Sequence, residues 1–508
     1  MGLADYYDRS AIAVSQVVAG FDANAFRILL EGTSVGVSFG DDATDCLQGR
    51  AALDLTVRLL ARLYPTLDIR PAPGSTACTA QLADELRALA TDINPRIAIE
   101  VGADTGVAIG AAPAEWAHTI HAGSTAWAGS ISTHRPQRLG RTPTVFGAGI
   151  AACLAAAAVF RTLLDTTGPA PSDATVTAFG NSPAQPSTRG ISGRPTLPGR
   201  TVLVGAGAIG QAAAWALART PMEGRLLVVD PEPVDLGNLQ RYVLTVRGNV
   251  TGPKAPLAAD HINAIGTARG GPFIAAEPFE GDWADALRTH GHDWDAALAA
   301  LDSATDRRGV QATLPHWLAN AWTQTGDLGV SDHDFTGGAC LACLYLPTGL
   351  RPNKDELVAN ALGIPEQAPQ VRDLLHLGIT IPDALIDLIA ARLGVDATLI
   401  APYASRGIDA LYVEGICGGG VLPLTGGLTQ GEMHVPLAHQ SAMAGVLLAA
   451  RLARRAMQLP TPGTEVMRLD LQRDPGPSPV QPAAKDPREL CLCQDETFVK
   501  AYRQLWRP

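Results

Sequence analysis

Residues 201–219, TVLVGAGAIGQAAAWALAR, decide the fold of this chain. The apolar run TVLV indicates a buried strand, and Gly205, Gly207 and Gly210 follow it at once. The first glycine permits a tight turn and the second lets backbone N–H groups approach a phosphate. The third lets the next helix, expected over 210–219, lie close to the strand. The segment predicts a nucleotide-binding strand–loop–helix unit, although alone it fits NAD, FAD, ATP or a turn that binds nothing.

The residues beyond this loop continue an α/β pattern. Asp230 ends the next strand, where a carboxylate accepts ribose hydroxyls, and Asp302 ends a later strand. Alternating strands and helices predict a parallel, doubly wound sheet over 200–345, with its ligand at the carboxyl ends of the strands. The expected elements are strands at 225–230 and 296–301 and a helix at 254–265.

Residues 1–165 predict a second α/β domain in which no strand is followed by an intact Gly-x-Gly-x-x-Gly. The turn GADTG at 102–106 stands roughly where the other block has its glycine-rich loop, but it lacks the spacing that follows. The expected elements are strands at 27–30, 34–39 and 96–101, one or two strands within 116–131, and helices at 50–64 and 146–164.

The remaining segments differ in composition. Residues 166–199 are rich in Pro, Ser, Thr and Gly, which predicts a linker. Residues 346–432 predict a helical insertion, and residues 433–508 a helix, a strand and a cysteine-bearing tail that returns to the second domain. The expected elements are helices at 354–362, 371–377, 382–393 and 441–457 and a strand at 466–471.

Composition narrows the class of protein. A chain of 508 residues with 46% hydrophobic and 18% charged residues predicts two or three folded domains. The net charge of −11 argues against a nucleic-acid partner. The N-terminus lacks the layout of a signal peptide, and the longest apolar run, 147–160, is shorter than the roughly 20 residues that span a bilayer. We therefore expect a soluble cytoplasmic protein.

The stretch VVDPEPVDLGNLQRYVL, residues 228–244, places Asn238 and Arg241 after the ribose carboxylate, and Lys254 opens the next helix. With the glycine loop and Asp302, this order resembles the ubiquitin-activating enzymes and the related adenylyltransferases of thiamine and molybdopterin biosynthesis. Ala208 and Tyr242 depart from the family pattern, which has Gly and Gln there.

The resemblance implies roles for these residues. Asp230 would hold the ribose, Asn238, Arg241 and Lys254 would contact the phosphates of ATP, and Asp302 would bind Mg²⁺. The chemistry agrees, because a carboxylate that attacks the α-phosphate of ATP brings two anions together and needs cations there. A nicotinamide dehydrogenase needs none of these cations. The alternative for each cation taken singly is solvated surface charge.

Two close cysteine pairs predict a structural zinc site. GGACLACLYLP contains Cys340 and Cys343, and ELCLCQDE contains Cys491 and Cys493. Four thiolates suit tetrahedral Zn²⁺, and the related adenylyltransferases carry a similar zinc. The alternatives are a redox pair, which normally begins a helix, or buried free thiols.

Cys417 lies alone in LYVEGICGGGVLPLTGG, between the two pairs. Glycines around it leave room for an acyl group, and their N–H groups stabilise a thiolate. The resemblance implies that this cysteine takes the acyl group from the adenylate as a thioester. The alternative is a small apolar residue in a crossover loop.

The larger activating enzymes pair an active adenylation domain with an inactive copy, which the first block resembles at the level of its pattern. The inactive half often lends an arginine to the ATP phosphates, for which Arg9 and Arg50 are candidates. An unrelated N-terminal domain is the alternative, and the chain would act as an internal pseudodimer or as a homodimer.

The resemblance thus implies an enzyme that activates a ubiquitin-like protein at its C-terminal glycine with ATP, Mg²⁺ and Zn²⁺, and passes it to a conjugating enzyme. Its length and the region of Cys417 look like bacterial versions encoded with such partners, including those of antiphage defence. The alternatives are a sulfur-carrier adenylyltransferase that forms no thioester, a scaffold with a vestigial nucleotide fold, and a nicotinamide-linked oxidoreductase.

Overall fold

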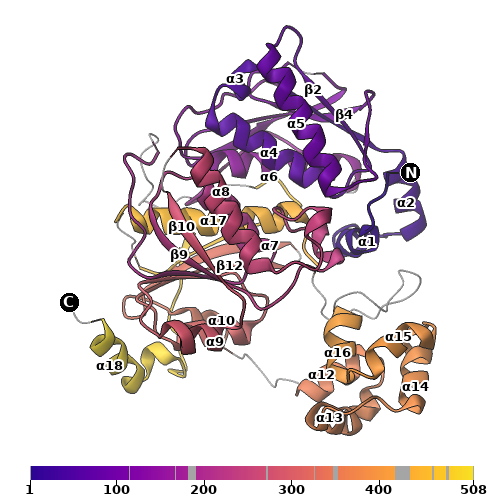
Figure 1. Cartoon of the computed structure of the whole chain (residues 1–508), viewed down its shortest axis with the longest axis vertical. Helices are drawn as coiled ribbons and strands as arrows, with labels where there is room; N and C mark the ends of the chain where they lie inside the picture. The colour runs from indigo at the N-terminus through magenta and orange to yellow at the C-terminus, as the bar shows by residue number, and fades with distance from the viewer. Residues whose placement is uncertain are drawn as a thin grey trace.

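The computed structural model describes residues 2–113, 115–165, 168–180, 190–270, 273–324, 326–346, 353–417, 435–459, 463–475 and 480–506. These residues form two α/β domains, a separate group of helices and a C-terminal tail (Figure 1).

The first domain is built on a seven-stranded sheet whose order is β3-β2-β1-β4-β5-β6-β7. The strands from β3 to β5 pair in parallel, and β6 and β7 are antiparallel. Their bounds are β1 (Ser34–Phe39), β2 (Thr66–Pro71), β3 (Ala98–Ile99), β4 (Thr105–Ile109), β5 (His118–Ser124), β6 (Ala128–Ser132) and β7 (Ala174–Thr177).

The second domain repeats this arrangement in an eight-stranded sheet of order β10-β9-β8-β11-β12-β13-β14-β15. Its first five strands are again parallel and the rest antiparallel. Their bounds are β8 (Thr201–Val204), β9 (Gly224–Val229), β10 (Ile274–Phe279), β11 (Ala296–Ala299), β12 (Trp317–Gln324), β13 (Asp327–His333), β14 (Glu465–Leu469) and β15 (Val480–Pro482). One fold therefore occurs twice, and the expected doubly wound α/β class is confirmed.

The helices repeat in the same positions. The first long helix after the first strand is α4 or α7, the helix after the second strand is α5 or α8, and the long helix before the seventh strand is α6 or α17. Their bounds are α4 (Leu47–Leu60), α5 (Ala77–Ile93), α6 (Phe146–Leu163), α7 (Ala208–Ala218), α8 (Lys254–Ala268) and α17 (Ala438–Ala456). Helices α9 (Trp283–His290) and α10 (Ala304–Ala312) complete the second domain.

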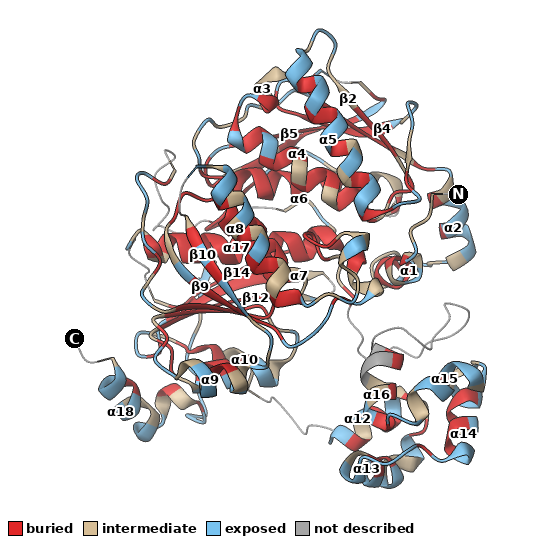
Figure 2. Cartoon of the chain, in the orientation of Figure 1, coloured by how far each residue is buried: buried red, intermediate tan, exposed pale blue. Residues whose placement is uncertain are grey.

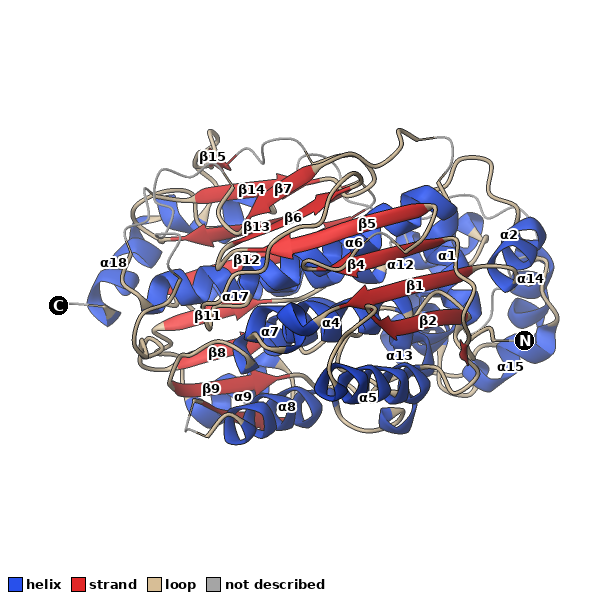
Figure 3. Cartoon of the chain, turned by 90° about the horizontal axis from the view of Figure 1, so that it is seen from above, coloured by secondary structure: helices blue, strands red, loops and turns tan. Residues whose placement is uncertain are grey.

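Helices α4, α6, α7 and α17 lie between the two sheets and join both domains in one apolar core (Figure 1; Figure 3 gives the view from above). Figure 2 shows that these helices are largely buried. Small residues allow close contact, since a Cβ on Gly445 would lie 2.3 Å from the Ile209 carbonyl oxygen. Helix α6 is apolar enough to cross a membrane, but 89% of its apolar window is buried inside the protein. Its hydrophobicity is therefore explained by packing between the sheets.

A group of helices is inserted between β13 and α17 and has an apolar core of its own. It lies to one side of the two sheets (Figure 1). The bounds are α12 (Lys354–Ala361), α13 (Ala368–Leu377), α14 (Asp383–Leu393), α15 (Ala397–Ala404) and α16 (Ile408–Ala410), followed by a π-helix over Leu411–Cys417. The remaining short helices are α1 (Tyr7–Ser15), α2 (Ala23–Glu31), α3 (Asp41–Thr44), α11 (Leu341–Leu344) and α18 (Glu496–Leu505).

Two predicted elements are wrong. Residues 27–30, expected as a strand, lie in α2, which Asp22 caps by accepting a hydrogen bond from Ala25 N at 2.7 Å. The buried residues of α2 are Phe26 and Leu30, which follow a helical spacing. The predicted linker contains β7, which extends the first domain beyond residue 165 by pairing with β6.

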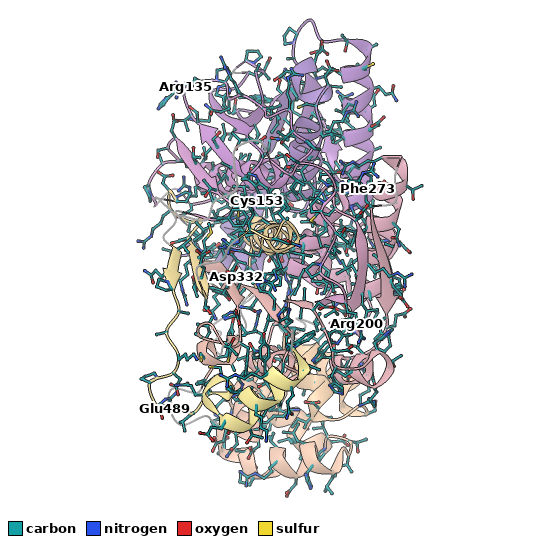
Figure 4. All side chains as sticks on the ribbon, turned by 90° about the vertical axis from the view of Figure 1, so that its left-hand side faces the viewer. Arg135, Cys153, Arg200, Phe273, Asp332 and Glu489 are labelled. Atoms are coloured by element: carbon teal, nitrogen blue, oxygen red, sulfur yellow. The ribbon has the colours of Figure 1, made fainter. Side chains whose placement is uncertain are left out.

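A buried ion cluster connects α17 to the second sheet. Arg454 donates to Asp332 Oδ2 at 2.5 Å and to Glu465 Oε2 at 2.9 Å, and Arg451 donates to Glu465 Oε2 at 3.2 Å. Asp332 lies beside the helix seen end-on in Figure 4. All four side chains are buried, so each charge depends on its partners for compensation.

Candidate functional site

The loop after β8 has the geometry predicted from its glycines. Gly205 has φ = +96°, and a Cβ there would lie 2.6 Å from the Ala300 carbonyl oxygen. A Cβ on Gly210 would lie 2.0 Å from the Gly205 carbonyl oxygen. Both contacts involve backbone atoms, so only glycine fits, and α7 begins directly at Ala208. The N-terminus of α7 thus lies at the carboxyl edge of the sheet, where it favours an anion.

Asp230 follows β9 and supports this loop. Its Oδ2 accepts a hydrogen bond from Ala206 N at 2.7 Å, and its Oδ1 accepts one from Glu232 N at 2.9 Å. Burial raises the pKa of the Asp230 carboxyl, and the charge of Lys254 and the two backbone N–H groups oppose that rise. Each oxygen retains a second lone pair with which it can accept a ribose hydroxyl.

Arg241 and Lys254 meet at one aromatic ring. The Arg241 Cζ lies 5.5 Å, and the Lys254 Nζ 5.3 Å, from the centroid of the Tyr242 ring. Within the part of the chain that the structure describes, the buried Nη1 of Arg241 has no hydrogen-bond partner. A guanidinium N–H without a partner is suited to an anionic ligand.

Lys254 begins α8 and is 3% exposed. Its Nζ pairs with Glu232 Oε2 at 2.5 Å. Burial by itself lowers the pKa of Lys254, but the neighbouring Tyr242, Asp230 and Glu232 together raise it above its ordinary value. Lys254 is therefore a cation at neutral pH.

Asn238 and Asp302 complete the set of residues predicted to bind the nucleotide, and each has its own surroundings. Asn238 Oδ1 accepts a hydrogen bond from Asp235 N at 2.9 Å and caps the 3₁₀-helix η1 (Leu236–Gln240), so its carboxamide holds the loop that carries Arg241. Asp302 follows β11 and is exposed. The buried Arg307 donates to the carbonyl oxygen of Leu301, which directly precedes Asp302. An exposed carboxylate at this edge fits a Mg²⁺ ion that also binds phosphates.

Strand register shows what the first domain lacks at the equivalent edge. Because Val204 pairs with Val229 and Phe39 pairs with Pro71, the residue equivalent to Asp230 is Ala72. The same reasoning through β11 and β4 makes Ala112 the equivalent of Asp302. The first domain thus has neither carboxylate.

The loop after β1 also differs from the glycine loop. Asp41 takes the place of Ala206, and its Oδ1 accepts hydrogen bonds from Thr76 N at 3.0 Å and Thr76 Oγ1 at 2.7 Å, beside the start of α5. The carboxylate thus lies at the N-terminus of α5, the counterpart of α8, which begins with Lys254 in the second domain. GADTG does not form this loop, because it leads into β4 at Thr105. The prediction that GADTG takes the place of the glycine loop is therefore wrong.

Of the two arginines expected to reach the site, only Arg9 lies near it. Helix α1 lies against η1, and a Cβ on Gly237 would be 3.8 Å from Arg9 Cγ. Arg50 instead donates to the Thr44 carbonyl oxygen at 2.7 Å within the first domain. Packing of α1 across the domain boundary is a tertiary fact that the sequence does not display.

The four predicted zinc ligands come together from two distant segments. The Sγ atoms of Cys340, Cys343, Cys491 and Cys493 all lie within 4.8 Å of one another. The Cys340–Cys491 and Cys343–Cys493 Sγ distances are 3.3 and 3.5 Å. Four thiolates around tetrahedral Zn²⁺ stand about 3.8 Å apart, so the cluster fits this ion. When bound, zinc would link the tail to the second domain, and α18 is also held by Tyr502 Oη, which donates to the His316 carbonyl oxygen at 2.9 Å.

Cys417 ends the π-helix that follows α16. Its side chain and residues 418–434 lie outside the described part of the structure. The role of Cys417 as a nucleophile therefore stays a prediction.

Sequence reasoning missed two arginines of the first domain. Arg62 Nη2 donates to the carbonyl oxygens of Tyr242 and of Thr245, the latter at 2.7 Å. Arg58 Nη1 donates to the Val243 carbonyl oxygen at 3.0 Å. No local pattern reveals such contacts, because they join residues about 180 positions apart in the chain.

Each of the two domains matches the model of a known protein family. Residues 197–462 match the model of the ThiF family, and residues 38–165 match a model described as Prokaryotic E2 family C. An uncharacterized protein, y4jF, of Sinorhizobium fredii is 40% identical over 99% of this chain and 97% of its own length. The SAMP-activating enzyme E1 of Haloferax volcanii is 38% identical over 84 residues, which are 16% of this chain and 29% of that protein.

Among solved structures, E. coli MccB with MccA-N7isoASN is 12% identical, with a TM-score of 0.37 over 58% of this chain and 67% of that one. This similarity is too low to transfer residues or function. The ThiF match by contrast spans just over half of the chain and contains the glycine loop, Asp230, Arg241, Lys254 and Asp302. The chain therefore belongs to the ThiF family, the adenylyltransferase family that its motifs resemble.

Proposed function

We propose that this protein uses ATP to activate the C-terminal glycine of a ubiquitin-like protein. The carboxylate oxygen attacks the α-phosphorus of ATP, the bond from that phosphorus to the bridging oxygen breaks, and pyrophosphate leaves. The product is an acyl-adenylate.

The observation that carries the proposal is the pair of cations at the carboxyl edge of the second sheet. Arg241 has a buried N–H without a partner among the described residues, and Lys254 is charged and buried beside it. The attack brings negative charge onto the α-phosphate, and fixed cations in a partly buried site stabilise that charge more than water does. A hydride transfer to a nicotinamide develops no negative charge on a phosphate that these cations would stabilise.

The other residues have supporting roles. Asp230 would accept the ribose hydroxyls, Asn238 would keep the Arg241 loop in place, and Asp302 would hold Mg²⁺ between the phosphates. Arg9 would reach the phosphates from the first domain. Because Ala72 and Ala112 replace the two carboxylates there, the first domain would bind no nucleotide, and one chain would bind one ATP.

In the second step, the Cys417 thiolate attacks the acyl carbon, the bond from that carbon to the AMP oxygen breaks, and AMP leaves while a thioester forms. The ubiquitin-like protein then passes to a conjugating-enzyme cysteine. The match of the first domain to a prokaryotic E2 family supports a conjugation setting, and we place the protein in a bacterial conjugation system of the antiphage type. Two face-to-face α/β domains in one chain supply a pseudodimer without a second copy.

Two measurements test both steps. Exchange of labelled pyrophosphate into ATP, in the presence of a ubiquitin-like protein that ends in glycine, reports the adenylate. A thiol-sensitive adduct on a non-reducing gel reports the thioester. We expect Cys417→Ala to retain exchange and lose the adduct, and the exposed Cys78→Ala to retain both.

The outcomes separate the alternatives. Exchange without an adduct in the unmutated protein would indicate a sulfur-carrier adenylyltransferase. An adduct that persists in Cys417→Ala would refute this nucleophile. Absence of both ATP binding and exchange would leave a scaffold, and NADH binding without ATP binding would indicate an oxidoreductase.

A further inference from the structure

Tyr242 stands at the centre of the candidate phosphate site, at a position where the resembled family has glutamine. The side chain is 6% exposed, and the centroid of its ring lies 5.5 Å from the Arg241 Cζ and 5.3 Å from the Lys254 Nζ. Both distances fall inside the range in which a cation is attracted by the face of an aromatic ring. One uncharged side chain thus contacts both cations of the site.

The same ring also contacts the glycine loop. A Cβ at Gly207 would lie 3.4 Å from the Tyr242 hydroxyl oxygen, so Tyr242 packs against the loop as well as against the two cations. Glu232 already pairs with the Lys254 ammonium at 2.5 Å, so the ring is not the sole contact that holds this cation. The ring attracts both cations without cancelling their charge, and Arg241 Nη1 stays without a hydrogen-bond partner among the described residues.

The backbone of Tyr242 is fixed by the first domain. Arg62, which is 2% exposed, donates from Nη2 to the carbonyl oxygens of Tyr242 and Thr245, and Arg58 donates to that of Val243. From the other side, Gln211 of α7 accepts hydrogen bonds from Leu244 N at 3.1 Å and Thr245 Oγ1 at 3.0 Å. The segment that carries the ring is therefore held between the two domains.

We propose that Tyr242 is a positioning residue that holds Arg241 and Lys254 for the phosphates of ATP, and that Arg62 of the first domain fixes Tyr242 in place. The first domain then contributes to ATP binding although it has no nucleotide site of its own. This proposal rests on the proposed function, because it assumes that the phosphates of ATP lie at this edge.

The test is the dissociation constant of the full-length protein for ATP and for adenosine, which has no phosphates. Tyr242→Leu removes the ring, and we expect its ATP dissociation constant to rise roughly 5- to 30-fold, from two cation–aromatic contacts of ordinary strength. The adenosine dissociation constant should stay within about twofold of the wild type. Tyr242→Phe keeps the ring and should restore ATP binding.

Fluorinated phenylalanines at position 242 provide a test that preserves shape. Each added fluorine weakens the attraction of the ring for cations, so the ATP dissociation constant should rise stepwise with fluorine number while that for adenosine stays constant. To test the contribution of the first domain, Arg62→Gln should raise the dissociation constant for ATP by a larger factor than that for adenosine. Arg87→Gln is the matched control, because Arg87 donates to the Ile69 carbonyl oxygen within the first domain, and it should leave both constants unchanged.

The results distinguish this proposal from the proposed function. If the unmutated protein does not bind ATP, the proposed function fails. If it binds ATP but Tyr242→Leu and the fluorinated series bind ATP as the wild type does, or lose ATP and adenosine by the same factor, Tyr242 has no role toward the phosphates. If Arg62→Gln changes neither constant, the interdomain step is wrong.

Discussion

Gly210→Ala tests whether the close packing of α7 on the glycine loop builds the nucleotide site. A Cβ at this position would lie 2.0 Å from the Gly205 carbonyl oxygen and 2.9 Å from its carbonyl carbon. Real Cβ contacts do not occur below 3.0 Å, so the loop and the helix must separate by about 1 Å. Both partners are backbone, and no side chain can turn away to absorb the change.

The magnitude follows from this displacement. Overpacking of a filled core costs about 1–3 kcal/mol, partly offset by the roughly 1 kcal/mol that alanine gains over glycine inside a helix. A misplacement of about 1 Å in a binding loop reduces rates by about 100-fold. We expect Gly210→Ala to lower the free energy of unfolding by up to about 2 kcal/mol and pyrophosphate exchange by about 100-fold.

The assay compares Gly210→Ala with Gly309→Ala by urea unfolding and by pyrophosphate exchange. Gly309 lies in α10, and a Cβ there meets no atom within 4 Å. Gly309→Ala should therefore raise the free energy of unfolding by up to about 1 kcal/mol without changing exchange. If Gly210→Ala unfolds and exchanges like the wild type, the loop does not depend on this contact and the account of it is wrong.

Three further results are expected. Arg454→Met leaves Asp332 and Glu465 short of a buried partner and should lower the free energy of unfolding by about 3–5 kcal/mol in urea titrations. Burial, and then the charge of Arg161, lower the pKa of His439 to about 3, so it stays neutral in the folded protein. The contribution of neutral His439 to the free energy of unfolding is complete above the unfolded pKa of about 6.5 and is lost as pH falls toward 3. Between pH 7 and pH 5 the free energy of unfolding should therefore fall by about 2 kcal/mol because of His439. Urea titrations at the two pH values should show that His439→Leu lacks this part of the pH dependence. Cys343→Ser should reduce bound zinc from about one ion per chain, measured by mass spectrometry, and make the tail that ends in α18 sensitive to protease.

The second domain was largely predictable because its signals are local. A buried strand, a glycine loop and a helix occupy 201–219, and the spacing to Asp230 and Lys254 follows from one βαβ unit. The paired cysteines were predicted for the same reason, since thiolate spacing is read directly from the chain. The short helix α2 was mistaken for a strand, because four successive apolar and charged residues carry no decisive period.

By itself, the sequence determined where a phosphate loop can form, which four cysteines are candidate ligands of a zinc site, and that two α/β domains exist. Only the tertiary structure decided that the domains share one strand order, that Asp41 binds the N-terminus of α5 in the first of them, and that Arg9 and Arg62 contact the second. The reason is physical. Glycine turns and strand patterns depend on neighbours along the chain, whereas contacts between residues about 180 positions apart depend on how the helices pack between two sheets.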